Sequence, residues 1–224
     1  MSAEEYFGNW LRVIDRNELN KAVSTIKKLY STTPCEPEYH NIFKVFNKTD
    51  YNKLCQVWVL QDPYPQKGIS TGIALANKES TKKLSPSLNI VKESIINLEV
   101  PHNYITFDPT LESWCEQGVF LLNAALTVET GKPGSHSAIW DSFTAKLLQN
   151  LSIWQPGMIY VLYGNRAKSF KPYITTASHI LELNHPAWYV RNEIKIPYKF
   201  YVELNNLTLK EFGRKIEYFK EMTL

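Results

Sequence analysis

The chain reads Gln56-Val57-Trp58-Val59-Leu60-Gln61-Asp62-Pro63-Tyr64 where its first apolar run meets a polar turn. The β-branched and aromatic residues of this run favour a β-strand over 56–60. Three more short apolar runs, at 119–122, 158–163 and 180–183, also stop at a polar residue or a glycine. Helical stretches separate the four runs, and this alternation predicts parallel strands joined by helices.

Residues with useful chemistry follow each of the four predicted strands. Asp62 follows the first run, Asn123 the second, Gly164 and Asn165 the third, and His185 the fourth. In an open parallel sheet, ligands bind beyond the carboxyl ends of the strands. We therefore expect Asp62, Asn123 and His185 to converge on one pocket, although they lie far apart in the sequence.

Each of these residues also has a purely structural explanation. Asp62-Pro63 is a turn-forming pair, Asn123 could cap the loop after its strand, and His185-Pro186 could hold a histidine satisfied within a loop. The shared position at strand ends favours the functional interpretation over three separate coincidences.

The remaining pattern predicts helices around the sheet. Apolar spacing indicates helices over 4–31, from 85–87 onward, over 110–117, through 139–151, and from about 207 to 219, with loops over 62–84 and 185–197. No internal repeat or flexible linker divides the chain. We expect residues 1–224 to form one α/β domain, an α/β/α sandwich whose small parallel sheet has about four strands.

Composition indicates which partners the protein could have and which cellular compartment to expect. The net charge of +3 permits a nucleic-acid partner without requiring one. No apolar run approaches the roughly 18 residues that span a bilayer, so we expect no membrane segment. The chain carries three cysteines without a C-x-x-C pair, and no secretory signal is visible. We expect a cytoplasmic protein with reduced thiols, or a nuclear one if its source is eukaryotic or viral.

Motifs for common cofactors are missing from the sequence. It contains no G-x-G-x-x-G, no Walker loop and no Cys/His/Asp cluster with metal-ligand spacing. We therefore expect neither a cofactor nor a metal ion in the site.

Several short motifs occur in a fixed order along the chain: Gln61-Asp62-Pro63-Tyr64, Gly72-Ile73-Ala74, Ser85-Pro86-Ser87-Leu88, Leu121-Leu122-Asn123-Ala124-Ala125-Leu126-Thr127-Val128 and His185-Pro186. Together they resemble the uracil-DNA glycosylases of the common, metal-free type, family 1. The resemblance extends over nearly the whole chain, and the Leu-Leu-Asn-x-x-Leu-Thr-Val block is its most specific part. The fold of that family, a small parallel sheet flanked by helices, agrees with the strand pattern.

The resemblance implies hydrolysis of the N-glycosidic bond of deoxyuridine after the base has left the DNA stack. Asp62 would stabilise the positive charge on the sugar and position the attacking water. His185 would donate a hydrogen bond to the oxyanion on uracil O2. Asn123 would bind the uracil edge and Tyr64 would exclude the methyl group of thymine, with Gln61 also contacting the substrate.

The same resemblance implies contacts to DNA, to phosphates above all. We expect them at Pro63, Ser87, Gly164, Asn165, Trp188, Tyr189 and Arg191. The implied partners are uracil-containing DNA, single- or double-stranded, and a proteinaceous glycosylase inhibitor. We expect the chain to act as a monomer.

Three departures from the family pattern make this chain a divergent member. Pro65 stands where the family usually has histidine, and Leu75 replaces the aromatic residue that stacks on uracil. After His185, in a loop that we expect to be exposed, the chain places Tyr189 where the family has the leucine that fills the gap left by the flipped base. Trp188 is the second candidate for this wedge, and burial of both rings in the core is the structural alternative.

Two other functions stay open. One is a DNA-binding or scaffold protein on the same fold, with weak or lost catalysis. The other is a base-excision enzyme with shifted substrate choice, for which Leu75 is the main argument. The joint presence of Asp62, Asn123 and His185 favours an active uracil glycosylase, because a binding module has little use for an oxyanion donor.

Overall fold

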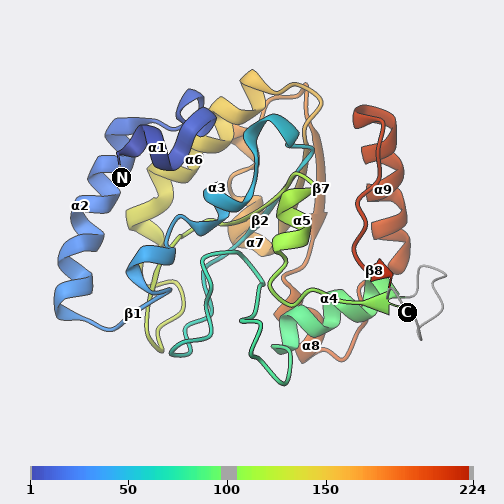
Figure 1. Ribbon diagram of the computed structural model, residues 1–224, viewed down its shortest axis with the longest axis horizontal. Helices are drawn as coiled ribbons and strands as arrows, with labels where there is room; N and C mark the ends of the chain where they lie inside the picture. Colours follow the sequence, from blue (N-terminus) through green and yellow to red (C-terminus); the bar gives the residue numbers. More distant parts are fainter. Residues whose placement is uncertain (1, 97–104, 222–224) are drawn as a thin grey trace.

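The structure is a computed structural model that describes residues 2–96 and 105–221. Its central layer is a four-stranded parallel sheet in the order β4-β2-β6-β7 (Figure 1). The strands are β2 (Gln56–Leu60), β4 (Val119–Asn123), β6 (Ile159–Tyr163) and β7 (His179–Leu183). The predicted α/β class is confirmed, and each strand begins and ends within one residue of its predicted range.

Helices surround this sheet. In the described residues the α-helices are α1 (Ala3–Phe7), α2 (Arg16–Thr32), α3 (Lys44–Lys48), α4 (Pro86–Ile96), α5 (Glu112–Glu116), α6 (Ser137–Trp154), α7 (Gly164–Lys168), α8 (Pro186–Arg191) and α9 (Tyr198–Phe212). Short 3-10 turns lie at Gly8–Arg12, Tyr39–Asn41, Tyr51–Lys53 and Lys171–Tyr173. Two small antiparallel pairs join β1 (Cys35–Glu36) to β5 (Val128–Glu129), and β3 (Ile105–Thr106) to β8 (Lys220–Glu221). No helix of the described ranges is long and apolar enough to cross a membrane.

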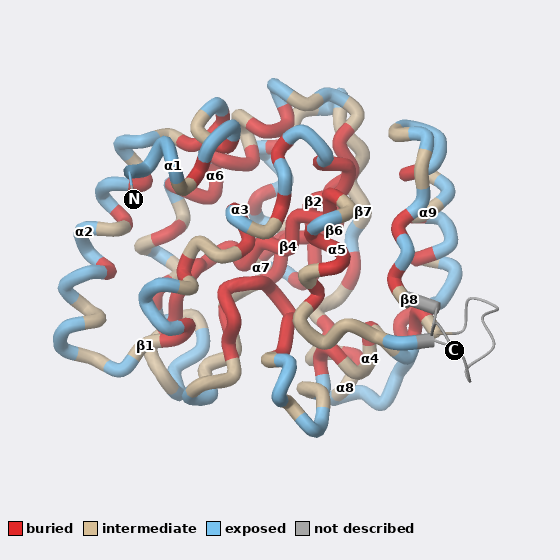
Figure 2. Tube along the Cα trace, viewed as in Figure 1, coloured by how far each residue is buried: buried red, intermediate tan, exposed pale blue. Residues whose placement is uncertain are grey.

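Aromatic side chains pack the helices against both faces of the sheet. On one face the ring of Trp58 lies 5.5 Å from that of Trp114 in α5 and 6.0 Å from that of Tyr201 in α9. On the other face Phe120 lies 4.3 Å from Trp10 and 5.0 Å from Phe46 of α3. Strands covered on both faces need apolar residues at every position, which is why the strand signal in the sequence is continuous. Figure 2 shows these strands as the buried centre of the molecule.

The parallel register brings the strand ends to one edge. Leu60, the last residue of β2, is paired with Asn123, the last residue of β4. Backbone hydrogen bonds continue beyond this pair, from Ala124 N–H to the Leu60 carbonyl (2.9 Å) and from Ala125 N–H to the Gln61 carbonyl (3.0 Å). These bonds hold the segment that carries Asp62 next to the segment that follows Asn123.

Three predicted elements differ from the structure. The helix expected over 4–31 is interrupted, because the side chain of Asp15 caps a new helix, α2, by accepting hydrogen bonds from the backbone of Asn17 and Glu18. The loop expected over 185–197 contains α8. The last helix, α9, spans Tyr198–Phe212 rather than about 207 to 219, and it ends where Gly213 adopts a left-handed conformation (φ +70°).

Gly118 illustrates a position where the backbone requires glycine. Its φ is +90°, and an added Cβ would overlap the carbonyl oxygen of Lys53. We expect Gly118→Ala to lower the free energy of unfolding by at least about 2 kcal/mol, because strain and overlap add. Urea unfolding measures this loss. Gly131→Ala is the matched control, since Gly131 also has positive φ (+81°) but open space around it; equal losses for both variants would contradict the account.

Candidate active site

The predicted site residues lie at the carboxyl edge of the sheet. Asp62 comes two residues after β2, Asn123 ends β4, Gly164 follows β6 and His185 comes two residues after β7. All four strands are parallel, so these positions share one edge. The structure therefore places at one edge of the sheet residues that 123 positions of sequence separate, counted from Asp62 to His185.

Asp62 is held by a backbone donor from another loop. Its carboxylate accepts a short hydrogen bond from the backbone N–H of Gly134. Burial raises the pKa of Asp62, and the hydrogen bonds from Gly134 and Gln61 oppose that rise. A carboxylate in this half-buried setting acts strongly on a nearby positive charge, because little water screens it.

His185 caps the helix that follows it. Its Nδ1 accepts a hydrogen bond from the backbone N–H of Ala187 (3.2 Å), and Pro186 stands at the first helical position. A nitrogen that accepts carries no proton, so the proton of the neutral ring lies on Nε2. Burial, with a smaller effect from the charge of Arg191, lowers the pKa of His185 to about 4. At neutral pH His185 is thus an uncharged donor through Nε2.

The backbone of Gly164, directly after β6, lies close to His185, which follows β7. Its φ is +83°, and an added Cβ would come within 2.9 Å of the Cβ of His185. The backbone of Gly164 can therefore approach the histidine as no other residue could. Asn165, next in the chain, is exposed.

Asn123 has an amide group that is free to bind a ligand. The residue is only 6% exposed. Within the part of the chain that the structure describes, no hydrogen bond engages its side chain. A buried amide offers both a donor and an acceptor, and leaving both unmatched is costly unless a ligand or water binds them.

Tyr64 and Leu75 are joined by a hydrogen bond. The hydroxyl of Tyr64 donates to the carbonyl of Leu75 (3.0 Å) and lies 2.7 Å from the hydroxyl of Ser85. Burial raises the pKa of Tyr64 to about 12. Leu75 is buried and has a φ of +67°, which is uncommon for a residue with a side chain.

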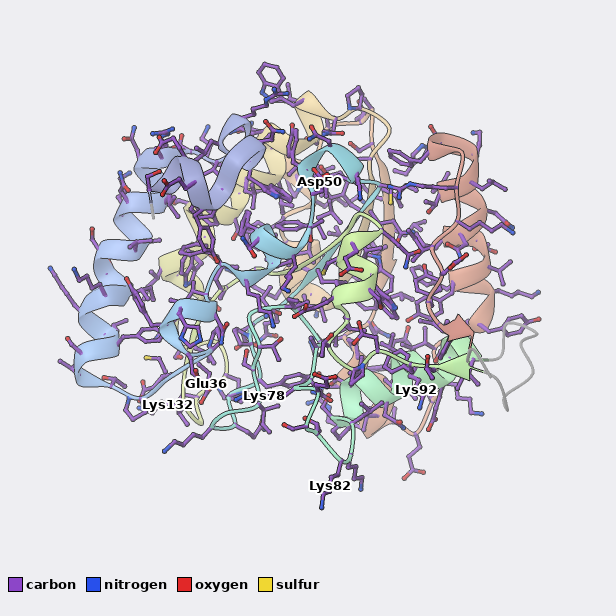
Figure 3. The ribbon with its side chains drawn as sticks, in the orientation of Figure 1. Glu36, Asp50, Lys78, Lys82, Lys92 and Lys132 are labelled. Carbon is purple, nitrogen blue, oxygen red and sulfur yellow. The ribbon has the colours of Figure 1, made fainter. Side chains whose placement is uncertain are left out.

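The predicted DNA contacts fall into two groups. Ser87 and Pro63 are buried, whereas Asn165 and Arg191 are exposed. Two exposed lysines lie on loops: Figure 3 shows Lys82 at the tip of the loop between β2 and α4 and Lys132 on the loop after β5. Lys132 is paired with Glu129 (2.6 Å), and surface cations of this kind favour binding of a polyanion.

The segment after His185 differs from the exposed loop that the sequence predicts. It forms α8, and Tyr189 is 7% exposed and lines a groove with Pro86 and Ile90 of α4. Trp188 is half-buried, with its ring edge-on to Tyr189 at 5.1 Å. The turn of the helix therefore directs Tyr189 into the protein and leaves Trp188 as the aromatic side chain nearer to solvent.

Two supporting features of the site escape prediction from the sequence. Gly134 supplies the donor to Asp62, and a buried chain of hydrogen bonds holds its loop, from Trp140 Nε1 to Thr127 Oγ1 (2.8 Å) and between Thr127 and His136 Nδ1 (2.9 Å). Thr127 belongs to one of the sequence motifs, but its hydroxyl contact depends on the tertiary structure. Among residues 2–96 and 105–221, no group of three or more His, Cys, Asp or Glu side chains could hold a metal ion.

Comparison with known proteins places this geometry in a family. The model of the uracil DNA glycosylase superfamily matches residues 57–208. The uracil-DNA glycosylase of Borreliella burgdorferi is 37% identical over 194 residues, which cover 82% of this chain and 85% of that protein. The uracil-DNA glycosylase of Fusobacterium nucleatum is 33% identical over 199 residues, or 87% of this chain and 85% of that protein.

Solved structures show the same fold at lower identity. Mimivirus uracil-DNA glycosylase superposes with a TM-score of 0.71 at 20% identity, covering 96% of this chain and 91% of that chain. The protein named UNG from Nitratifractor salsuginis gives a TM-score of 0.59 at 20% identity, covering 94% and 88%. On the family match and the identity to curated relatives, this chain belongs to the uracil DNA glycosylase superfamily.

Proposed function

We propose that this chain is a DNA repair enzyme of the family 1 type that excises uracil by hydrolysing the N-glycosidic bond of deoxyuridine. One observation carries the proposal. A half-buried carboxylate (Asp62), a neutral Nε2 donor (His185) and an unengaged amide (Asn123) lie at the carboxyl edge of one parallel sheet, the edge where ligands bind.

The chemistry needs charge stabilisation at both ends of the breaking bond. The C1′–N1 bond breaks with its electron pair moving onto the uracil, which leaves positive charge on the sugar and negative charge on uracil O2. Asp62 stabilises the cation and orients a water that adds to C1′, and the proton that this water loses neutralises the uracil anion. Nε2–H of His185 donates to O2, and the low pKa of His185 keeps it in the donating neutral form.

Recognition uses the base edge and the C5 position. Asn123 donates to uracil O4 and accepts from N3–H, so the amino group of cytosine is mismatched. Tyr64 closes the C5 side against the methyl group of thymine, and Gln61 borders the substrate next to Asp62. Because the sugar carbon is out of reach inside a duplex, the nucleotide must first flip out of the stack.

The DNA backbone is held by Pro63, Ser87, Gly164, Asn165 and Arg191, contacts that position the strand without reading sequence, and Trp188 contacts the base stack. We propose that the chain acts as a monomer on uracil in single- or double-stranded DNA, without a metal ion. We also propose that a proteinaceous inhibitor binds it. The Y322L variant of mimivirus UNG, which shares this fold with a TM-score of 0.72 at 19% identity, has been solved in complex with UGI.

Leu75→Phe tests the reduced stacking surface. Base–aromatic stacking is worth roughly 1–3 kcal/mol, so we expect phenylalanine to lower KM for uracil-containing DNA about fivefold or to raise activity. Steady-state kinetics with Leu75→Ala as the opposite control measures this. Lost activity in a folded Leu75→Phe protein would mean that the pocket is shaped around leucine and holds the base differently.

A comparison of Trp188→Ala with Tyr189→Ala shows which ring fills the gap left by the flipped base and which ring supports the core. We expect Trp188→Ala to lower activity on duplex uracil DNA much more than on single strands, where no gap in a stack needs filling. We expect Tyr189→Ala to lower the melting temperature by several degrees and to affect both substrates equally, because its ring is buried. If Tyr189→Ala alone lost activity selectively on duplex DNA, Tyr189 rather than Trp188 would be the residue that fills the gap.

One assay separates the proposed function from its alternatives. The release of free base is measured with EDTA present from oligonucleotides that contain uracil, hypoxanthine or a T·G mismatch. Release of uracil alone supports the proposal. Release of another base in preference indicates shifted specificity, and DNA binding without any release indicates a binding protein.

A further inference from the structure

Ser85 touches Tyr64 from a part of the chain that the reaction does not use. Its hydroxyl lies 2.7 Å from the phenol oxygen of Tyr64, whose own hydroxyl lies 3.0 Å from the carbonyl of Leu75. A carbonyl has no proton, so Tyr64 must donate to Leu75. The phenol has no second proton, so Ser85 donates to the Tyr64 oxygen.

Ser85 is itself fixed from two sides. Its backbone N–H donates to the side-chain oxygen of Asn77 (2.7 Å), a residue 1% exposed whose own backbone N–H donates to the carbonyl of Pro109 (2.8 Å). The Ser85 hydroxyl also accepts from the backbone N–H of Leu88 (3.4 Å), so it caps the start of α4. These bonds hold both the backbone and the hydroxyl of Ser85 in place.

These hydrogen bonds form a closed network in the part of the pocket that is proposed to face the base. Asn77 lies two residues after Leu75, Tyr64 binds Leu75, and Ser85 binds both Tyr64 and Asn77. Tyr64 and Leu75 are the two residues assigned to the C5 side and the stacking side of uracil. Ser85 thus ties the wall of the base pocket to the helix that carries Ser87.

We propose that Ser85, held by Asn77, is a positioning residue that fixes the ring of Tyr64 and so sets the discrimination between uracil and thymine. This inference rests on the proposed role of Tyr64. A phenol held by two hydrogen bonds cannot tilt away from the C5 position without breaking one of them. With only the Leu75 bond left, the ring gains the freedom to make room for a methyl group.

The pKa of Tyr64 agrees with this direction of the hydrogen bond. Burial raises the pKa of Tyr64, and the hydrogen bond with Ser85 opposes that rise. A partner that lowers the pKa of a phenol is one that donates to its oxygen.

Ser85→Gly is the main test, because glycine is tolerated as a helix cap with a loss of only a few tenths of a kcal/mol. The measured quantity is the ratio of the inhibition constants of free thymine and free uracil, together with kcat/KM for uracil and for T·G substrates. We expect the thymine-to-uracil ratio to fall about five- to tenfold, the scale of one hydrogen bond, with a smaller change in kcat/KM for uracil.

Two comparisons keep the test specific. Tyr64→Phe removes the other partner, so Ser85→Gly should add nothing in the Tyr64→Phe background. Ser94→Ala removes another buried hydroxyl of α4, one that donates to the Ile90 carbonyl (2.7 Å), and should leave the ratio unchanged.

The outcomes distinguish this inference from the proposed function. An unchanged ratio for Ser85→Gly, an equal change for Ser94→Ala, or additive effects of Ser85→Gly and Tyr64→Phe would overturn the positioning role. Tyr64→Ala tests the underlying assignment: if it leaves thymine rejection intact, the proposed role of Tyr64 fails and not the link between Ser85 and Tyr64.

Discussion

Asp62→Asn is expected to cut the single-turnover rate of uracil release by at least about 10²-fold, the scale of losing one preorganised electrostatic element. Asparagine keeps the size of the side chain but removes the charge that stabilises the sugar cation. Its amide oxygen can still accept the hydrogen bond from Gly134 N–H, so the local fold is preserved. Binding to uracil-containing DNA should survive.

Asp108→Asn is the matched control for this loss. Asp108 is also a partly buried aspartate whose carboxylate accepts backbone hydrogen bonds, from Thr110 and Ser113 at the start of α5. Its replacement should lower stability and leave turnover close to that of the wild type. Turnover by Asp62→Asn equal to that of the wild type would remove Asp62 from the mechanism.

His185→Gln is expected to lower turnover by about 10²–10³-fold, because a flexible glutamine amide replaces a ring donor that the hydrogen bond from Ala187 N–H holds in place. The pH dependence adds a sharper test. His185 titrates with a pKa of about 4, so it stays neutral and donating from pH 8 down to about 5. The contribution of His185 to kcat/KM should therefore be constant over that range and change only as the pH falls toward 4, where protonation of Nδ1 keeps the Nε2–H donor but breaks the hydrogen bond from Ala187 N–H.

The same shift has a consequence for stability with a defined sign. The pKa is lower in the folded chain than the usual 6.5, so between pH 6.5 and 4 the unfolded chain binds more protons at this residue. The stability that His185 contributes is full above about pH 6.5 and declines as the pH falls through this window. His40→Gln, at an exposed histidine, is the control; a titration of kcat/KM near pH 6.5 that His185→Gln abolishes would contradict the neutral donor.

Three strands of the sheet, β2, β4 and β6, can be predicted from sequence because they are buried at every position. Val57, Trp58 and Val59 leave no polar position at the centre of β2, so the run is visible without any periodicity. The rule that ligands bind beyond the carboxyl ends of parallel strands then places Asp62, Asn123 and His185 at one edge of the sheet from the order of the runs alone.

Helix α8 could not be predicted from sequence because it lacks the usual signals of a helix start. The cap of α8 is a histidine side chain, which is not among the common helix caps, and Pro186 is typical of both a loop and a first helical position. A helix of six residues is also too short for apolar spacing to reveal it. The inward direction of Tyr189 follows from that helix, so the prediction of an exposed Tyr189 is wrong for the same reason.

The support of the site depends on contacts between distant segments. Gly134 acts on Asp62 through its backbone N–H, a group that every residue except proline carries, so no residue type marks it. Ser85 and Asn77 act on Tyr64 only because the loop after β2 folds back onto α4. Such contacts appear only once the chain is folded.

The most direct test of the proposed reaction is the release of free uracil from a single-stranded oligonucleotide with one deoxyuridine, in EDTA, by the wild type and Asp62→Asn side by side. We expect the wild type to release uracil and leave an abasic site, and the variant to do so at no more than about one-hundredth of the rate. No uracil from the folded wild type, release that stops on chelation and returns with zinc or magnesium, or equal rates for both proteins would contradict it.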